Sequence, residues 1–242
     1  MEAVASLRVH QILVDVLTAR SDAGGSVVER LCAASVEALP VSGAGLALMT
    51  ATGHGGTVAA TDGSATVMEN LQNTLGEGPC IDAFREGRPV LHSDLASTGL
   101  SRWPGFASGA LEAGIAAAFA FPLQVGAIRL GVLDFYRHTT GSLAGSELAL
   151  ALDFAAAATT LVLDLQDVTA PGHLHPHLAD AAASHREIHQ ATGMITVQAA
   201  VGITEALLLL RARAYAQARP LRDLAKDVVA RRVTFRLEED PS

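Results

Sequence analysis

Arginine side chains gather near the C-terminal end of the chain. Residues 185–236 contain nine of the seventeen basic side chains but only four of the twenty-five acidic ones, a net charge of +5. Residues 1–184 hold eight basic and eighteen acidic groups and carry −10. An arginine guanidinium is a planar fork that fits phosphate oxygens and guanine edges and stacks on exposed bases. The charge asymmetry therefore indicates a small module that meets a polyanion.

Three short helices are expected to position these side chains. Pro220 stands at the first position of the third helix, where its missing N–H costs nothing. Behind it, apolar residues at i, i+3, i+4, i+7 and i+8 predict one buried stripe. These residues are Leu221, Leu224, Ala225, Val228 and Val229. Arg211, Arg222 and Lys226 fall outside the apolar stripes, so we expect a basic outer surface.

The two preceding helices also begin with residues that are typical of helix starts. One is expected over about residues 203–217, with Gly202 and Thr204 at its start. The earlier one contains Ile188, Ala191 and Ile195. Ser184 and Glu187 have the spacing of a capping box before it, although residues 181–183 could carry the helix further upstream.

Three sequence blocks carry a family resemblance. They are residues 188–195 (IHQATGMI), Glu205-Ala206 followed by residues 210–214 (LRARA), and residues 219–225 (RPLRDLA). In order and spacing they resemble the ANTAR family of RNA-binding output domains, which act in transcription antitermination. The resemblance covers nearly all of residues 185–235. Many family members have Lys where this chain has Thr192, so one cationic contact to RNA is absent or lies elsewhere.

The resemblance implies an RNA-binding surface that grips hairpin loops in nascent transcripts. Its expected residues are Arg186, Gln190, Thr192, Gly193, Arg211, Arg213, Arg219 and Arg222. Gln190 and Thr192 are able to hydrogen-bond a looped-out base, and Gly193 would permit close approach of the RNA backbone. The alternative is that the arginines are only the solvated face of a small bundle. Arg231, Arg232 and Arg236 would add phosphate contacts or form a frayed tail.

The first two thirds of the chain predict an α+β domain. Helices are expected over residues 7–19, 27–39, 64–73, 106–113 and 147–168, and strands over 45–50, 57–60, 90–91, 115–121 and 129–137. Residues 53–56 (GHGG) are expected to form a hairpin turn, and an irregular stretch rich in Gly and Pro follows residue 73. Consecutive hairpins with helices at both ends indicate an antiparallel sheet with helices packed on it.

Four segments of this domain also carry a resemblance. They are residues 75–83 (LGEGPCIDA), 87–90 (GRPV), 121–123 (FPL) and 128–136 (IRLGVLDFY). They resemble the GAF family of small-molecule sensor domains, in the sub-type joined to ANTAR modules in actinobacterial proteins. The fold class implied is a GAF-like antiparallel sheet flanked by helices over residues 7–167, then a linker at 168–177, a three-helix ANTAR bundle at 178–236 and an acidic tail at 237–242. The ligand and any cofactor stay unknown.

Candidate ligand-binding residues of the GAF-like domain are Cys80, Trp103, Phe106 and Phe119. Cys80 invites interpretation as a redox thiol or a haem ligand, but a small buried hydrophobic residue is the favoured alternative. Trp103 lines a pocket or simply packs beneath a helix, and the second is favoured. Alternating His173, His175 and His177 favour a solvated linker over a metal site.

These features predict a signal-responsive RNA-binding antiterminator that acts as a cytoplasmic homodimer without a membrane span. No enzyme signature is present in the sequence, because residues 76–78 (GEG) lack the downstream Gly-Lys of a phosphate-binding loop. The apolar stripe of the helix at 147–168 is expected either to pair two copies or to pack entirely on the sheet. Two other functions stay open: a regulator that docks an acidic protein, and a redox or haem sensor.

Overall fold

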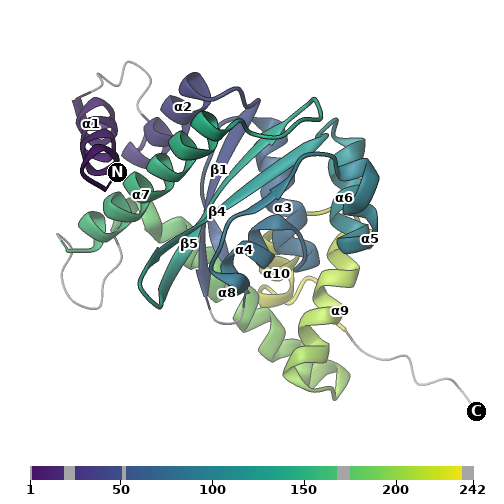
Figure 1. Ribbon diagram of the computed structural model, residues 1–242. Helices are drawn as coiled ribbons and strands as arrows, with labels where there is room; N and C mark the ends of the chain where they lie inside the picture. The colour runs from purple at the N-terminus through teal and green to yellow at the C-terminus, as the bar shows by residue number, and fades with distance from the viewer. Residues whose placement is uncertain (1, 19–24, 51–52, 168–174, 236–242) are drawn as a thin grey trace, which may run out of the picture.

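The computed structural model describes residues 2–18, 25–50, 53–167 and 175–235 and divides into two packed parts (Figure 1). An N-terminal unit, through residue 167, is built around one sheet. A C-terminal bundle, from residue 175, contains three helices. Figure 1 shows the bundle below and to one side of the sheet.

Five antiparallel strands form the sheet, in the order β2-β1-β5-β4-β3. Their bounds are β1 Gly43–Thr50, β2 Gly53–Ala60, β3 Val90–His92, β4 Ala117–Val125 and β5 Ile128–Arg137. β4 and β5 form the central hairpin around Gly126, which has φ +58 and so takes the left-handed conformation that glycine allows. The expected antiparallel sheet is confirmed.

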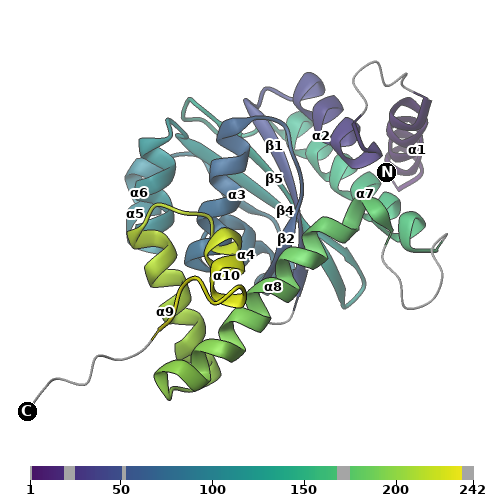
Figure 2. The ribbon, with the colours of Figure 1, turned by 180° about the vertical axis from the view of Figure 1, so that it is seen from behind.

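Helices cover both faces of the sheet. On one face lie α1 Glu2–Thr18, α2 Val27–Ala38 and α7 Gly145–Asp167; on the other lie α3 Gly63–Leu75, α4 Pro79–Glu86 and α6 Pro104–Glu112, with the short η1 Leu95–Gly99 and α5 Leu100–Arg102 beside them (Figures 1 and 2). Side chains alternate between the faces along each strand. In β4, Phe119 and Phe121 enter the core with α2 and α7, whereas Ala118 and Ala120 enter the core with α3 and α6.

Two local predictions were wrong. Residues 53–56 belong to strand β2 instead of a turn, because the connection between β1 and β2 falls at residues 51–52, outside the described residues. The stretch after residue 73 is also not irregular throughout. Pro79 begins helix α4 at the position where proline is tolerated, and Gly87 ends it with φ +66. The glycine and proline residues of this stretch mark the ends of a helix, whereas in the sequence alone they indicate an irregular segment.

The C-terminal bundle consists of α8 Pro176–Ala199, α9 Ile203–Ala216 and α10 Leu221–Val229. Most residues of the predicted apolar stripes lie in its core, which contains the buried residues Ile188, Ala191, Ile195, Ala199, Ala206, Leu210, Ala214, Leu221, Leu224, Ala225 and Val228. The capping box at Ser184 was wrong, since Ser184 is buried inside α8, and the upstream alternative is confirmed. Pro220 precedes α10 as its N-cap, one position earlier than predicted. Residues 176–177 of the predicted linker already belong to α8.

The bundle packs on the open edge of the sheet and on α3. α8 runs alongside β2, and α9 and α10 contact α3 (Figure 2). At Gly56 of β2 an added Cβ would lie 2.6 Å from the Cα of Ala181 in α8, so only glycine permits this backbone approach. This packing of α8 covers β2, which would otherwise expose an unpaired strand edge.

Helix α7 is long and apolar enough by composition to cross a bilayer, but half of its most apolar window is buried inside the fold. Ala155, Thr159 and Val162, three members of the predicted stripe, are buried in the N-terminal unit. This is the arrangement of a core helix, and the sheet uses most of the stripe. Leu152 is 45% exposed and stays available for contact with another copy.

Candidate nucleic-acid interface

One exposed face of α8 brings together three of the predicted RNA-binding residues. Arg186, Gln190 and Gly193 follow one another at i, i+4 and i+7, so they lie on one side of the helix. All three are exposed. The next residue of the same stripe, Val197, is 84% exposed, which places an apolar side chain beside the polar ones. An apolar and hydrogen-bonding surface of this kind suits an unstacked base.

Arg231 joins this face from the end of α10. It lines a shallow hollow with residues of α8, namely Gln190, Gly193, Met194, Val197 and Gln198. Its backbone has φ +60, the left-handed conformation, just after the C-cap of α10. The sequence offered Arg231 only as a non-specific phosphate contact or a frayed tail. Its position against Gln190 and Gly193 depends on how α10 packs on α8, which no local pattern indicates.

Gly193 lies mid-helix with open space around it. A Cβ added there would meet nothing within 4 Å. Glycine in a helix interior costs about 0.8–1.0 kcal/mol relative to alanine. The position therefore carries a stability cost without a packing reason inside this chain, which is consistent with a requirement for close approach from outside.

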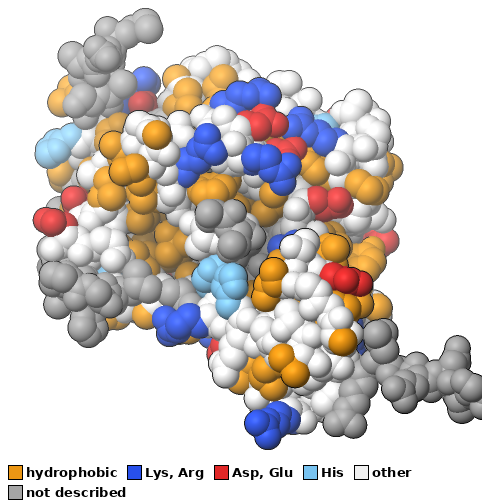
Figure 3. Space-filling view, turned by 90° about the horizontal axis from the view of Figure 1, so that it is seen from below, with side chains coloured by type: hydrophobic (Ala, Val, Ile, Leu, Met, Phe, Trp, Pro, Cys, Tyr) orange, Lys and Arg blue, Asp and Glu red, His pale blue; other side chains and the backbone are white. Residues whose placement is uncertain are grey.

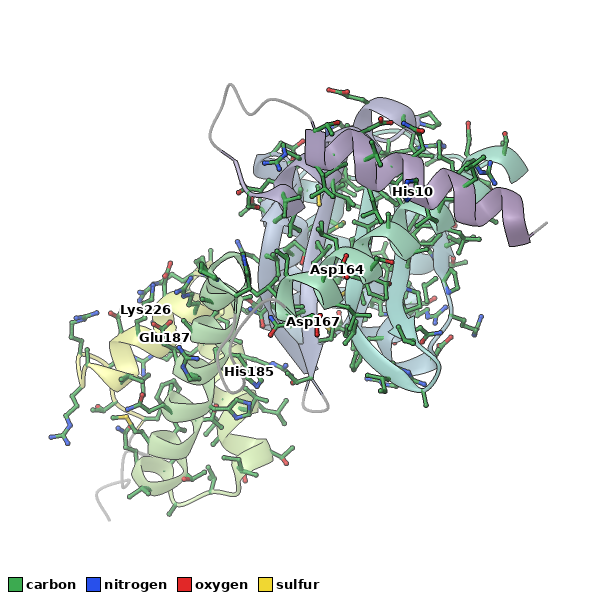
Figure 4. The ribbon with its side chains drawn as sticks, turned by 90° about the vertical axis from the view of Figure 1, so that its left-hand side faces the viewer. His10, Asp164, Asp167, His185, Glu187 and Lys226 are labelled. Atoms are coloured by element: carbon green, nitrogen blue, oxygen red, sulfur yellow. The ribbon has the colours of Figure 1, made fainter. Side chains whose placement is uncertain are left out.

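Other predicted arginines are held in ion pairs within the bundle. Arg219 pairs with Asp227 at 2.6 Å, and Arg222 of α10 pairs with Glu187 of α8 at 3.0 Å. Hydrogen bonds from Arg219 and Arg232 lower the pKa of Asp227. Figure 4 shows Glu187 on the side of α8 that faces α10, the helix of Lys226. These ion pairs hold Arg219, Arg222 and Arg232, three of the nine basic side chains in residues 185–236.

Arg213 contacts the last two residues that the structure describes, Thr234 and Phe235. Its Nη1 donates to the carbonyl of Thr234 at 2.9 Å, and its guanidinium lies 4.9 Å from the centre of the Phe235 ring. In Figure 3 the basic side chains on the visible part of the bundle are separated by uncharged and apolar ones, so they do not form a continuous patch.

Thr192 does not lie with Gln190 and Gly193 on the surface. Its side chain is only 3% exposed, and its hydroxyl donates to the carbonyl of Ile188 at 2.7 Å. Its role as a hydrogen-bonding partner of RNA stays a prediction, and in this arrangement of the helices the hydroxyl is not accessible to a base.

Arg211 lies between the bundle and the N-terminal unit. Its guanidinium covers the backbone of Gly76 at the end of α3, where an added Cβ would come within 2.7 Å of Cζ. Burial lowers the pKa of Arg211, and its Nε has no hydrogen-bond acceptor among the residues that the structure describes. The predicted RNA contact is therefore partly covered by the other domain.

The four predicted ligand-binding residues do not converge on one cavity. Cys80, Trp103 and Phe106 enter the core beside α3, α4 and α6, whereas Phe119 enters the core on the opposite face of the sheet. All four are buried. The register of β4 does not follow from the sequence alone. This register places the Phe119 side chain on the face of the sheet opposite to Cys80, Trp103 and Phe106.

Cys80 and Trp103 have structural contacts. Burial raises the pKa of the Cys80 thiol well above its usual range, and Sγ lies 3.8 Å from Sδ of Met49. The Trp103 Nε1–H donates to Asp82 at 3.0 Å, and the Arg102 guanidinium lies 4.8 Å from its ring. The favoured alternatives, a buried hydrophobic thiol and a packed tryptophan, match this geometry.

A buried polar cluster lies between α3 and β5. Burial raises the pKa of Glu69 to about 7, and hydrogen bonding with the side chains of Asp134 and Thr57 offsets part of this rise. Gln72 donates to Asp134 at 3.4 Å and accepts from the backbone N–H of Cys80 at 2.7 Å. No sequence pattern indicated this cluster, since Glu69 and Gln72 have the appearance of ordinary helix residues.

Solved structures with a similar fold include the following three from bacteria. A domain of a protein described as a two-component sensor histidine kinase from Sinorhizobium meliloti 1021 is 25% identical, covering 61% of this chain and 96% of its own, with a TM-score of 0.49. The GAF domain region of a membrane protein from Geobacter sulfurreducens PCA is 14% identical, with coverages of 66% and 97% and a TM-score of 0.47. A GAF domain of an Acinetobacter phosphoenolpyruvate-protein phosphotransferase is 10% identical, with coverages of 68% and 96% and a TM-score of 0.49.

Sequence comparison assigns both parts of the chain. Comparison with curated proteins finds no match. A family model described as GAF domain matches residues 25–163, more than half of the chain, and one described as ANTAR domain matches residues 177–229. The chain therefore belongs to the GAF domain family and carries an ANTAR domain at its C-terminal end.

Proposed function

We propose that this protein is a signal-responsive RNA-binding regulator that acts by transcription antitermination. The ANTAR domain binds hairpin loops in nascent RNA, and the GAF domain senses the signal. The observation that carries the proposal is the exposed face of α8, where Arg186, Gln190 and Gly193 lie together within the ANTAR match. Arg231 extends this face.

Each residue of the face has a distinct role in the proposal. Arg186 and Arg231 contact phosphates, Gln190 hydrogen-bonds an unstacked base, and Gly193 lets the RNA approach the helix backbone. Arg219 and Arg222 stabilise the bundle through their ion pairs with Asp227 and Glu187. They contact RNA only at the edge of the α8 face. Phosphate contacts release counterions, so RNA affinity falls steeply with salt.

The protein acts as a cytoplasmic homodimer in this proposal, without catalytic activity. Two ANTAR domains then engage two hairpins of one transcript. Both cysteines are free thiols in the structure, as suits a reducing compartment. The dimer contact uses exposed apolar residues of α7, including Leu152 and Leu163, which are 45% and 41% exposed.

The test is a titration of the full-length protein with a two-hairpin RNA, a scrambled single strand and duplex DNA. Hairpin-selective binding that weakens at least tenfold in Gln190→Ala supports the proposal. Arg85→Ala, an exposed arginine of the GAF domain, is the matched control and leaves affinity unchanged. Equal weak binding to all three nucleic acids contradicts it.

A second candidate function is docking of an acidic protein on the bundle. It is favoured by exposed apolar side chains on α9, since Ile203, Leu208 and Tyr215 are each at least half exposed. Binding to a protein partner that is lost in Leu208→Ser and insensitive to Gln190→Ala distinguishes this function from RNA recognition.

A further inference from the structure

A pocket of about 380 Å³ is lined by residues from all three helices of the ANTAR domain and by Asn73 of the GAF domain. Ten residues line it: Asn73 from α3, His185, Ile188, His189 and Thr192 from α8, Ile203, Thr204, Leu207 and Arg211 from α9, and Leu221 from α10. Its floor is apolar, and its rim carries basic and hydrogen-bonding groups. In volume and in this mixture it matches sites for small organic molecules.

Arg211 is the arginine that lines this pocket, and it has no counter-ion among the residues that the structure describes. Among the described residues, no carboxylate pairs with its guanidinium, and its buried Nε has no hydrogen-bond acceptor. A guanidinium keeps its proton even when it is desolvated, so burial alone does not remove the charge. Buried charges in proteins are normally paired, because an unpaired one loses its hydration without compensation. The arrangement calls for an anion that the described residues do not supply.

The GAF domain holds Arg211 in place without neutralising it. The guanidinium rests on Gly76, and its Nη2 comes near Gly53 of β2, where an added Cβ would lie at 3.8 Å. Neither glycine has a side chain to offer. Asn73 contributes a neutral amide on the same side. The cavity therefore exists in this form only while the two domains are packed together.

Two histidines complete the polar rim. His185 and His189 are four residues apart on α8, and their Nε2 atoms lie 2.9 Å from each other. Figure 4 shows His185 on the side of α8 that faces the GAF domain, opposite Glu187. No Asp or Glu is among the ten lining residues. Within the described part of the chain no group of three side chains is arranged for a metal ion, so the chemistry of the rim favours an anion over a cation.

We propose that this cavity binds a small organic anion, with a phosphate or carboxylate group at Arg211 and the histidines and an apolar, ring-sized body over Leu207 and Leu221. The ligand bridges α8 and α9 and closes on the GAF domain, so its binding stabilises the packed arrangement of the two domains. A consequence for RNA affinity rests on the proposed function; the binding site itself does not.

The test titrates the full-length protein by calorimetry with three probes. Phenyl phosphate carries the anion and the ring, inorganic phosphate the anion alone, and phenol the ring alone. We expect binding in the order phenyl phosphate, inorganic phosphate, phenol, and a loss of at least tenfold for phenyl phosphate in Arg211→Gln. Arg85→Gln, which lies on the GAF surface away from the cavity, keeps wild-type affinity.

A second variant guards against misfolding of the first. Asn73→Asp is nearly isosteric and places a carboxylate in the cavity, so it should pair with Arg211, raise the thermal midpoint and weaken phenyl phosphate at least tenfold. Phenyl phosphate that binds wild type and both variants equally, or binds none of them, overturns the proposal.

A two-hairpin RNA separates the two sources of phosphate. RNA that displaces phenyl phosphate and itself loses affinity in Arg211→Gln assigns the anion to RNA and overturns a free small molecule. RNA that binds without displacing it supports the proposal. Because the calorimetric titrations contain no RNA, their failure leaves RNA recognition standing, and failure of RNA binding leaves the cavity result intact.

Discussion

The guanidinium of Arg211 in the ANTAR domain lies directly on the backbone of Gly76 in the GAF domain. Gly76 has φ +68 and ends α3, so glycine there serves both the helix end and the close approach. A side chain at this position would occupy the space of the guanidinium. This contact ties the residue that was expected to bind RNA to the domain that was expected to sense a signal.

We expect Gly76→Ala to separate the two domains. The variant loses about 1 kcal/mol from the left-handed backbone conformation and also clashes with Arg211. Small-angle scattering should show a larger radius of gyration, and hydrogen exchange should rise in α9. Gly87→Ala is the matched control, because Gly87 ends α4 with φ +66 and meets only flexible side chains of the GAF domain. An equal expansion in both variants would show that strain, and not the contact, is responsible.

Gly193→Ala should separate stability from binding. The added Cβ meets nothing within 4 Å, so the variant should gain about 0.5–1 kcal/mol in free energy of unfolding. If RNA approaches the helix backbone here, the same variant binds the two-hairpin RNA more weakly. Chemical denaturation and RNA titration measure the two effects. Gly63→Ala, at the exposed start of α3 in open space, should leave RNA affinity unchanged.

Thr192→Val tests whether the buried hydroxyl contacts RNA. The methyl replacement keeps the shape of the side chain and removes only the bond to the Ile188 carbonyl, so we expect less than about 1 kcal/mol of destabilisation. RNA affinity should stay within twofold of wild type. A large loss of affinity with unchanged stability would mean that the bundle opens when it binds RNA.

Glu69 should make stability depend on pH. Its folded pKa of about 7 lies above the usual value, so the folded protein binds this proton more tightly than the unfolded chain does. The stabilising effect is complete below about pH 4.5 and is lost as pH rises through 7. Relative to wild type, Glu69→Gln should therefore gain stability between pH 5 and pH 7, measured by thermal unfolding. The exposed Glu112→Gln should show no such trend.

Both thiols should resist modification in the folded protein. Burial raises the pKa of Cys32 to about 12 and that of Cys80 well above its usual range, and only the thiolate reacts. Ellman's reagent at pH 8 should label neither cysteine until denaturant is added. Rapid labelling in the native protein that is absent in Cys80→Ala would contradict this prediction and support a redox role for Cys80.

Local patterns indicated the family and most of the elements, but they missed α4 and the first half of β2. The apolar spacing of Leu221, Leu224 and Val228 predicts α10 because a helix repeats every 3.6 residues and one side must be buried. The same periodicity places Arg186, Gln190 and Gly193 on one face of α8. Sequence blocks around Thr192 and Cys80 were enough to name both domains, which the family matches confirm.

Tertiary structure decided which basic groups are free. Arg219 and Arg222 were predicted together with Arg186, yet Asp227 pairs with Arg219 and Glu187 of α8 pairs with Arg222 of α10. Arg211 became buried because α9 packs on Gly76, more than one hundred residues away in the chain. Charge and periodicity are local quantities, whereas ion pairing and desolvation depend on distances between elements, and only the packed structure sets those distances.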